Sequence, residues 1–113
     1  MSHLRELGSP PSNTERLLLW RRRLNMSQEE AAKHFGVSMR TFTGWEYGTK
    51  GGVPKVALGR LEAYEVCFLY RRRSGMSVTT LASDLGCTAY WVTRIERGRE
   101  PSSVSTLLEY WEC

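Results

Sequence analysis

The chain has 113 residues, of which 41% are apolar, 11% aromatic and 25% charged, a balance typical of a globular protein with one hydrophobic core or two small ones. A chain of this size does not accommodate a substrate cleft together with a separate cofactor domain, so we expect a binding module rather than an enzyme. Sixteen Lys and Arg against twelve Asp and Glu give a formal net charge of +4.

The positive charge is concentrated in the middle of the chain. Residues 14–100 contain fifteen of the bases and nine of the acids, and thirteen of the sixteen bases are Arg. The planar guanidinium of Arg suits phosphate and guanine better than the point charge of Lys does. Nucleic acid is therefore the leading class of partner.

The sequence gives little support for a catalytic site, a metal site or a membrane-spanning segment. Cys67, Cys87 and Cys113 are an odd number without C-x-x-C spacing, so we expect no disulfide framework, no metal, no cofactor and a reduced, cytoplasmic setting. His3 and His34 are the only histidines, and no triad spacing surrounds them. Residues 1–6 lack an apolar signal core, and no apolar run is long enough to cross a bilayer.

The sequence repeats itself after 50 residues. Arg21-Arg22-Arg23 aligns with Arg71-Arg72-Arg73, Met26-Ser27 with Met76-Ser77, and twelve of the 34 positions from 15 to 48 are identical, where chance gives about two or three. Many other pairs exchange one apolar residue for another, which marks them as core positions. We call the two segments the first and the second copy.

Capping residues predict the helices of each copy. Asn13 can cap a helix over about 14–24, and Ser27 with Glu30 forms a capping box before a helix over about 28–35. Gly36 ends that helix, and Ser38 caps the next one, over about 39–47. The second copy repeats this pattern with Ser77, Gly86, Thr88 and Gly98, and places its corresponding helix over about 89–97. Two short helices joined through a Gly turn form a helix-turn-helix.

A further apolar-periodic segment follows each copy. In the second copy Pro101 precedes Val104, Leu107, Leu108 and Trp111 at helical spacing. In the first copy Pro54 opens a stretch that runs without a linker to Arg73, which predicts one long helix shared by both copies. We therefore expect an all-α fold of two tandem helix-turn-helix bundles that share a long central helix. The expected domains are a flexible arm over 1–13, a first domain over 14–64 and a second over 64–113.

In the first copy Gln28-Glu29-Glu30-Ala31-Ala32 precedes Gly36-Val37-Ser38, and Trp45-Glu46-Tyr47-Gly48 follows. With these residues the first copy closely resembles the phage repressor/Cro (XRE-type) helix-turn-helix family. The resemblance implies that the third helix of each copy lies in the major groove of DNA. The base-reading positions that it implies are Met39, Arg40, Thr43 and Gly44 in the first copy, and Ala89, Tyr90, Thr93 and Arg94 in the second.

The spacing of apolar residues supports these positions independently. Phe42 and Trp45 lie on one side of the third helix, which leaves residues 39, 40, 43 and 44 on the opposite side. Arg40 and Arg94 have the chemistry to bind guanine in a bidentate manner. Met39, Ala89 and the methyl groups of Thr43 and Thr93 could contact thymine methyl groups.

The resemblance also implies structural and phosphate-binding residues. An Arg of the first helix pairs with a Glu late in the third, which here gives Arg21 with Glu46 and Arg71 with Glu96. Gln28 would hold a phosphate and brace the reading helix. From their place after the reading helices, we expect further phosphate contacts from loop residues Thr49, Lys50, Lys55, Arg97 and Arg99.

The second copy departs from this pattern. Val78 stands where Gln28 stands in the first copy, and Trp91 replaces Thr41. A protein partner could therefore bind the Trp91 face. The first helices also carry surplus apolar residues, namely Leu18, Leu19, Phe68 and Leu69. Such residues are expected if the two copies pack together or the chain forms a homodimer. They also offer a second surface for a protein partner.

Two function classes follow from the sequence. The first is a sequence-specific regulator of transcription that binds a double-stranded DNA operator, of the repressor type found in phage or mobile elements. The alternative is a protein-binding helix-turn-helix module, such as an antitoxin or an anti-activator, in which DNA contact is secondary or lost. Arg40, Gln28 and the basic middle favour the first class, whereas Val78, Trp91 and the surplus apolar faces of the first helices favour the second.

Overall fold

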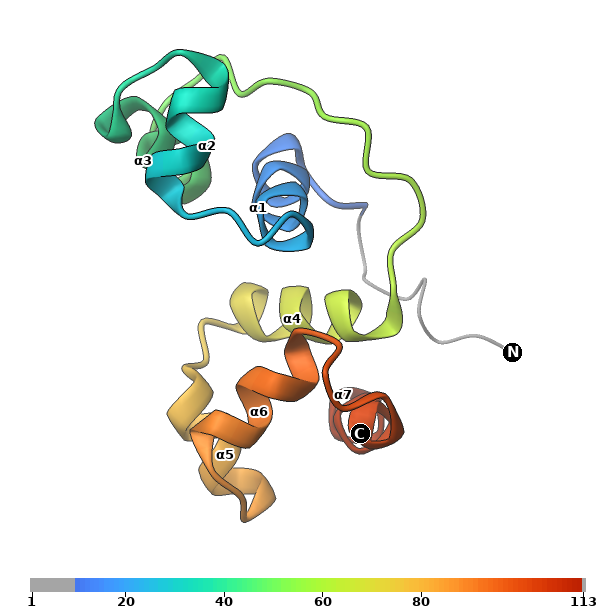
Figure 1. Cartoon of the computed structure of the whole chain (residues 1–113). Coiled ribbons are helices and arrows are strands. Elements are labelled where there is room, and N and C mark those ends of the chain that lie inside the picture. Colours follow the sequence, from blue (N-terminus) through green and yellow to red (C-terminus); the bar gives the residue numbers. More distant parts are fainter. Residues whose placement is uncertain (1–9, 113) are drawn as a thin grey trace. The chain divides into compact units, whose positions relative to one another are not determined.

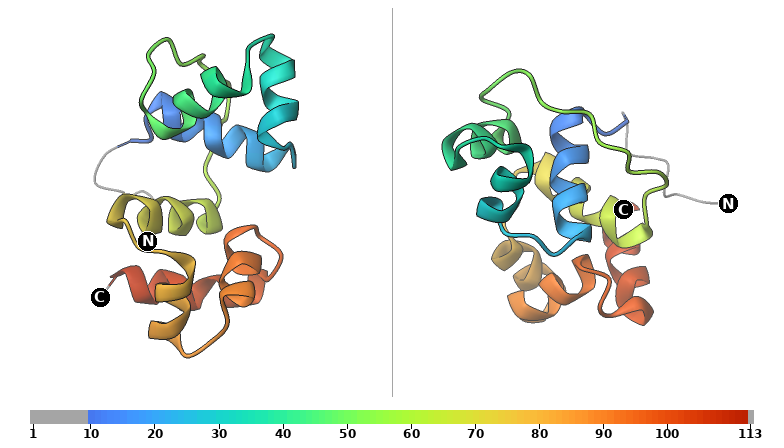
Figure 2. Two further views of the ribbon diagram at one scale, coloured as in Figure 1. Left: turned by 90° about the vertical axis from the view of Figure 1, so that its left-hand side faces the viewer. Right: turned by 45° about the horizontal axis from the view of Figure 1, so that its top comes forward.

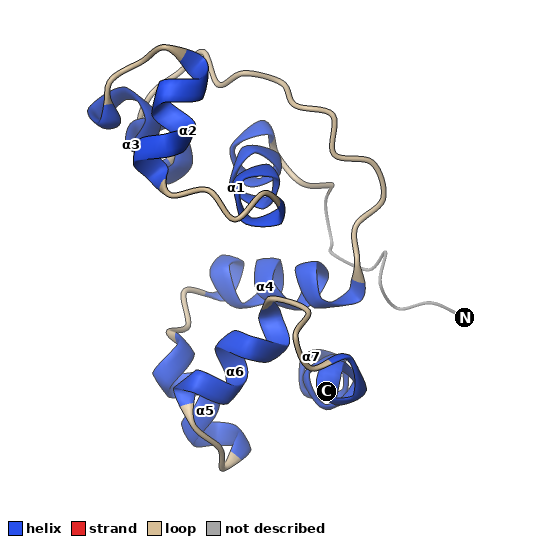
Figure 3. Cartoon of the chain, in the orientation of Figure 1, coloured by secondary structure: helices blue, strands red, loops and turns tan. Residues whose placement is uncertain are grey.

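The described part of the chain, residues 10–112 of a computed structural model, is all-α and contains no strand (Figures 1 and 3). It divides into two compact units, Pro10–Arg60 and residues 61–112, which we call the first and the second unit. Most of the predicted N-terminal arm, together with His3 and Cys113, lies outside the described residues.

The first unit contains three helices, α1 (Asn13–Arg23), α2 (Gln28–Phe35) and α3 (Met39–Tyr47). Helix α3 packs on both α1 and α2. Their shared core consists of Leu17, Ala31, Ala32 and Phe42. Partly buried aromatic side chains surround it, and Phe35 contacts the rings of both Phe42 and Trp45. Burial of this apolar surface is what fixes the orientation of such short helices.

The second unit contains α4 (Ala63–Ser74), α5 (Val78–Leu85), α6 (Ala89–Glu96) and α7 (Val104–Glu112), the last preceded by a 3₁₀ turn over Pro101–Ser103. Its core is formed by seven buried residues: Cys67, Leu81, Ala82, Val92, Ile95, Val104 and Leu107. Helix α7 packs against α4, and Figure 1 shows it beside that helix. The predicted helical segment after Pro101 is therefore confirmed.

The predicted capping residues are confirmed with one correction. Ser27, Ser38, Ser77 and Thr88 each accept a hydrogen bond from a backbone N–H in the first turn of the following helix. The cap of α1, however, is Ser12 and not Asn13. Ser12 forms a reciprocal capping box with Glu15, which satisfies two backbone donors where a lone cap satisfies one.

The turn between the second and third helix has the same backbone in both units. Gly36 has a φ of 69° and Gly86 a φ of 72°, in the left-handed region that only glycine enters without strain. Both glycines end the preceding helix, and the next helix begins three residues later. Each unit therefore contains two helices joined by a Gly turn, at the positions that the capping pattern predicted.

The predicted long central helix is wrong. Residues 54–62 are irregular and α4 begins only at Ala63, as Figures 2 and 3 show. Gly59 lies in the left-handed region with a φ of 73°, which interrupts any helix through this segment. In a helix, the backbone carbonyls of this segment would accept hydrogen bonds from backbone N–H groups. Here three of them accept hydrogen bonds from Arg side chains of α1 instead. Arg16 donates to the carbonyl of Val56, and Arg23 donates to those of Leu58 and Arg60. These bonds offset the loss of helical hydrogen bonding.

The surplus apolar residues of the first helices, Leu18, Leu19, Phe68 and Leu69, are all buried.

Candidate nucleic-acid interface

A buried carboxylate fixes the position of α3. The Nε atom of Arg21 donates to Oε2 of Glu46 at 2.6 Å and its Nη2 atom donates to Oε1 at 3.2 Å, while Nε2 of Gln28 donates to Oε1 at 2.9 Å. Glu46 is only 2% exposed, so these charge-assisted bonds replace its lost hydration. Arg21 also donates to the carbonyl of Met26 at 2.9 Å. One side chain of α1 and one of α2 therefore hold the end of α3.

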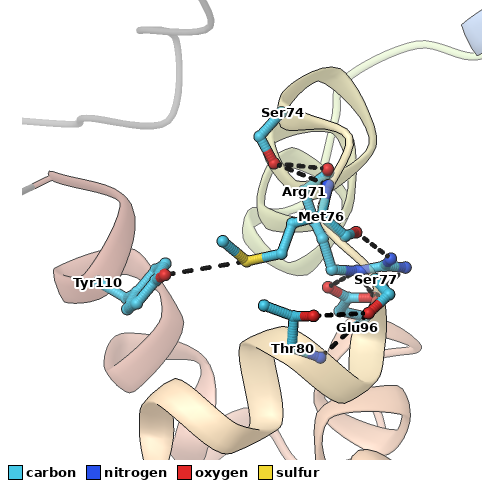
Figure 4. Close-up of polar contacts among 7 residues, drawn as sticks. All are labelled: Arg71, Ser74, Met76, Ser77, Thr80, Glu96 and Tyr110. Carbon is cyan, nitrogen blue, oxygen red and sulfur yellow. Dashed lines mark hydrogen bonds and ion pairs between the residues drawn. The ribbon is translucent and has the colours of Figure 1, made fainter.

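The second unit repeats the ion pair without the Gln. Arg71 binds Glu96 through Nε, at 2.8 Å to Oε2, and through Nη2, at 3.0 Å to Oε1. Its Nη1 atom donates to the carbonyl of Met76 at 3.1 Å, as Figure 4 shows. In the same view the hydroxyl of Tyr110 points toward the Met76 sulfur. Both predicted ion pairs are therefore present, and each one fixes the helix that follows the Gly turn.

The outer face of α3 carries polar and cationic groups. Arg40 is exposed, and Met39 is 44% exposed. Thr43 is half-buried, and its hydroxyl donates to the carbonyl of Arg40 at 3.1 Å, which leaves its methyl group available for an apolar contact. Three of the four predicted base-reading residues of the first unit are thus at least partly accessible.

The fourth, Gly44, is buried, so the expectation that it faces a partner is wrong. Its carbonyl accepts from the backbone N–H groups of Thr49 and Lys50 at 2.9 and 3.2 Å. A Cβ atom added at Gly44 would lie 3.0 Å from Cβ of Lys50. The loop after α3 folds back over this position, which the helix spacing alone could not reveal.

The corresponding face of α6 is more aromatic. Tyr90 is 69% exposed and Trp91 37% exposed, whereas Ala89 is half-buried and Thr93 is exposed. Exposed aromatic side chains supply a large contact area and lose little conformational entropy on binding. They are therefore common in interfaces with proteins and with nucleic acids. The two units therefore present different chemistry at matching positions.

Arg94 has intramolecular partners that the sequence analysis did not anticipate. Its Nε atom donates to Oε2 of Glu100 at 2.7 Å, and its guanidinium lies 5.8 Å from the ring centre of Tyr90. The hydrogen bond with Glu100 is the largest cause of a raised pKa of Arg94, and Tyr90 acts in the same direction. Glu100 lies six residues from Arg94, beyond the end of α6, so helical periodicity carries no signal for this pair.

The predicted backbone-binding loop residues follow α3 and α6 in the chain. Thr49, Lys50 and Lys55 are exposed after α3, as are Arg97 and Arg99 after α6. Gln28 is half-buried at the start of α2, where its bond to Glu46 agrees with the predicted brace. Cationic groups around the end of a helix are well placed for phosphate oxygens on either side of a groove.

The described residues offer little other chemistry. No group of three His, Cys, Asp or Glu in this part of the chain could hold a metal ion. Cys67 lies in the core of the second unit, and its burial, with smaller effects from the charges of Glu96 and Glu112, raises its pKa to about 12. No helix among residues 10–112 is long and apolar enough to cross a membrane.

Comparison with known proteins identifies the class of the second unit. Residues 69–110 match the family model of a helix-turn-helix domain. The match begins within α4 and ends within α7, so it includes the Gly86 turn and the whole of α6. No curated protein and no solved structure matches the chain significantly. This part of the second unit is therefore similar to a helix-turn-helix domain.

Proposed function

We propose that this chain is a sequence-specific, double-stranded DNA-binding regulator of transcription, of the repressor type found in phage and mobile elements. In this proposal the first unit is a second, tandem helix-turn-helix of the repressor/Cro kind. One observation carries this proposal. In each unit a buried Arg–Glu ion pair holds the helix that follows the Gly turn, α3 or α6, on its core-facing side, and the opposite face of that helix carries exposed side chains. A helix held in this way can enter a groove without changing its position.

The contacts divide into two classes. In the first unit Arg40 would donate to guanine, and Met39 and the Thr43 methyl group would contact apolar base edges. Thr49, Lys50 and Lys55 would bind phosphates, together with Arg97 and Arg99 of the second unit. Phosphate contacts set the orientation and most of the salt dependence, whereas the helix residues distinguish one sequence from another.

Duplex binding at several salt concentrations tests this proposal. We expect the chain to bind DNA from the region upstream of its own gene, and a site selected from a random library, with a log–log slope of about −0.9 per phosphate contacted. Lys50→Ala should weaken all sequences alike and make the slope shallower by about one contact. A slope near zero between low and physiological salt would contradict the proposal.

Lys33→Ala is the matched control for Lys50→Ala. Lys33 is an exposed residue of α2 paired with Glu29 at 4.0 Å, and it belongs to none of the proposed contacts. The two substitutions remove the same charge from the same unit. Equal losses of DNA affinity would show only a general effect of net charge and would refute the assignment of Lys50.

Exposed aromatic residues on α6 favour a second candidate function. Tyr90 and Trp91 would suit a protein partner, in which case the chain acts as an antitoxin or an anti-activator. The same titrations separate the candidates, because such a module would show weak duplex binding without preference for any selected site.

A further inference from the structure

The sequence repeat places different residue pairs at one structural position. Residue 44 of α3 corresponds to residue 94 of α6, and residue 50 in the following loop corresponds to residue 100. The first unit has Gly44 and Lys50 there, and the second has Arg94 and Glu100. Both units therefore place one cation beside the reading helix, but the cation comes from the loop in one and from the helix in the other.

In the first unit the cation is open to solvent. A Cβ atom at Gly44 would lie 3.0 Å from Cβ of Lys50 and 3.7 Å from its Cδ, so the stem of Lys50 occupies the space that a larger residue 44 would need. Lys50 is exposed. Within the described part of the chain, no carboxylate lies at ion-pair distance from its ammonium group.

In the second unit the cation is neutralised. The carboxylate of Glu100 lies 2.7 Å from Nε of Arg94, and the two side chains are 22% and 34% exposed. The backbone N–H of Arg99 donates to the Arg94 carbonyl at 2.9 Å, which brings the loop back to the end of α6. A phosphate or a guanine that approaches Arg94 therefore meets the negative charge of Glu100 at the same place.

We infer that Glu100 restrains DNA binding by the second unit by holding Arg94 in an intramolecular ion pair. The inference rests on the proposed DNA-binding function. Arg94 contacts DNA fully only when it exchanges Glu100 for a phosphate or a guanine, and Lys50 makes no such exchange. The first unit therefore supplies most of the affinity, and Glu100 sets the contribution of the second.

Glu100→Gln in the full chain tests this inference. Glutamine keeps the size of the side chain and an acceptor for Arg94 but removes the charge. With a fluorescent random-sequence duplex of about three helical turns at low salt, we expect roughly two- to fivefold tighter binding, the range expected from releasing a partly exposed ion pair. In an Arg94→Ala background the same change should give no gain.

Glu109→Gln is the matched charge control, since Glu109 is an exposed acid on α7 of the same unit. We expect it to change the affinity less than Glu100→Gln does. Thermal melting checks that each variant folds, and Glu100→Ala serves as a second variant if Glu100→Gln does not. Unchanged or weaker binding by folded Glu100 variants, an equal gain from Glu109→Gln, or a gain that persists without Arg94 would each overturn the inference.

The outcomes also separate this inference from the proposed function. If the wild-type chain binds the duplex and the Glu100 variants bind no tighter, only the inference fails. If neither the wild type nor the Glu100 variants bind, the proposed function fails and the inference fails with it. If only the Glu100 variants bind, the expected DNA binding of the wild-type chain fails, and so does the inference that the first unit supplies most of the affinity.

Discussion

Glu46 and Glu96 are each 2% exposed, and a carboxylate at that depth is stable only with a cation and hydrogen-bond donors around it. The resemblance to the repressor family predicted both Arg partners, 25 residues away in the sequence, and both are confirmed. The bond from Gln28 to Glu46 agrees with the predicted brace. The pair of Arg94 with Glu100 was missed because a loop, and not a helix, brings its two residues together.

Removing the cation of either buried pair should destabilise the fold. Arg21→Met and Arg71→Met each leave a buried glutamate without its Arg, which costs about 3 to 5 kcal/mol. Lys33→Ala, which breaks the exposed pair with Glu29, should cost no more than about 0.5 kcal/mol. Urea unfolding followed by circular dichroism measures all three variants. If Arg71→Met unfolds at the same urea concentration as Lys33→Ala, the buried pair does not stabilise the second unit.

At the scale of elements, capping residues predicted the helix ends well because each cap is a local hydrogen bond between near neighbours in the sequence. The segment over residues 54–62 shows where local patterns stop being sufficient. The spacing of Ala57, Leu61 and Tyr64 and the position of Pro54 favour a helix. Long-range bonds from Arg16 and Arg23 and the packing of Val53 and Val56 on the first core favour an irregular chain instead. Tertiary contacts override the local preference here.

Arg23→Ala should loosen this segment. Arg23 donates to the carbonyls of Leu58 and Arg60, so its loss frees two acceptors and removes the main link between α1 and the segment. We expect thermolysin, which cleaves before apolar residues, to cut within 54–62 faster in this variant than in the wild type. Lys55→Gln, an exposed change within the same segment that adds no apolar residue, is the control. Equal cleavage rates for wild type and Arg23→Ala would show that these bonds do not order the segment.

At the scale of the whole molecule, the repeat of 50 residues predicted two tandem bundles, with a further helical segment after each copy. The structure keeps the ion pair and the Gly turn in both, but only the second unit has a fourth helix, α7, to complete its core. The family model matches this second unit, although the first copy carries the fuller resemblance in Gln28 and the residues after Gly36. A pairwise comparison of the copies could not predict this difference, because the 54–62 segment lies outside the aligned region.

The two reading helices should therefore contribute unequally to one binding site. Arg40 lies in the first turn of α3 and is exposed, whereas Arg94 lies one turn further along α6 and is paired with Glu100. Because no ion pair with a carboxylate of residues 10–112 must be broken first, Arg40→Ala should cost about 1 to 3 kcal/mol of binding free energy and relax the preference at one base pair. Arg94→Ala should cost less and relax the preference at a different base pair. Selection from a randomised-site library followed by footprinting measures both effects. If both variants lost the same base preference, the two helices would read equivalent half-sites, as in a symmetric pair. The difference between their surfaces would then have no role in recognition.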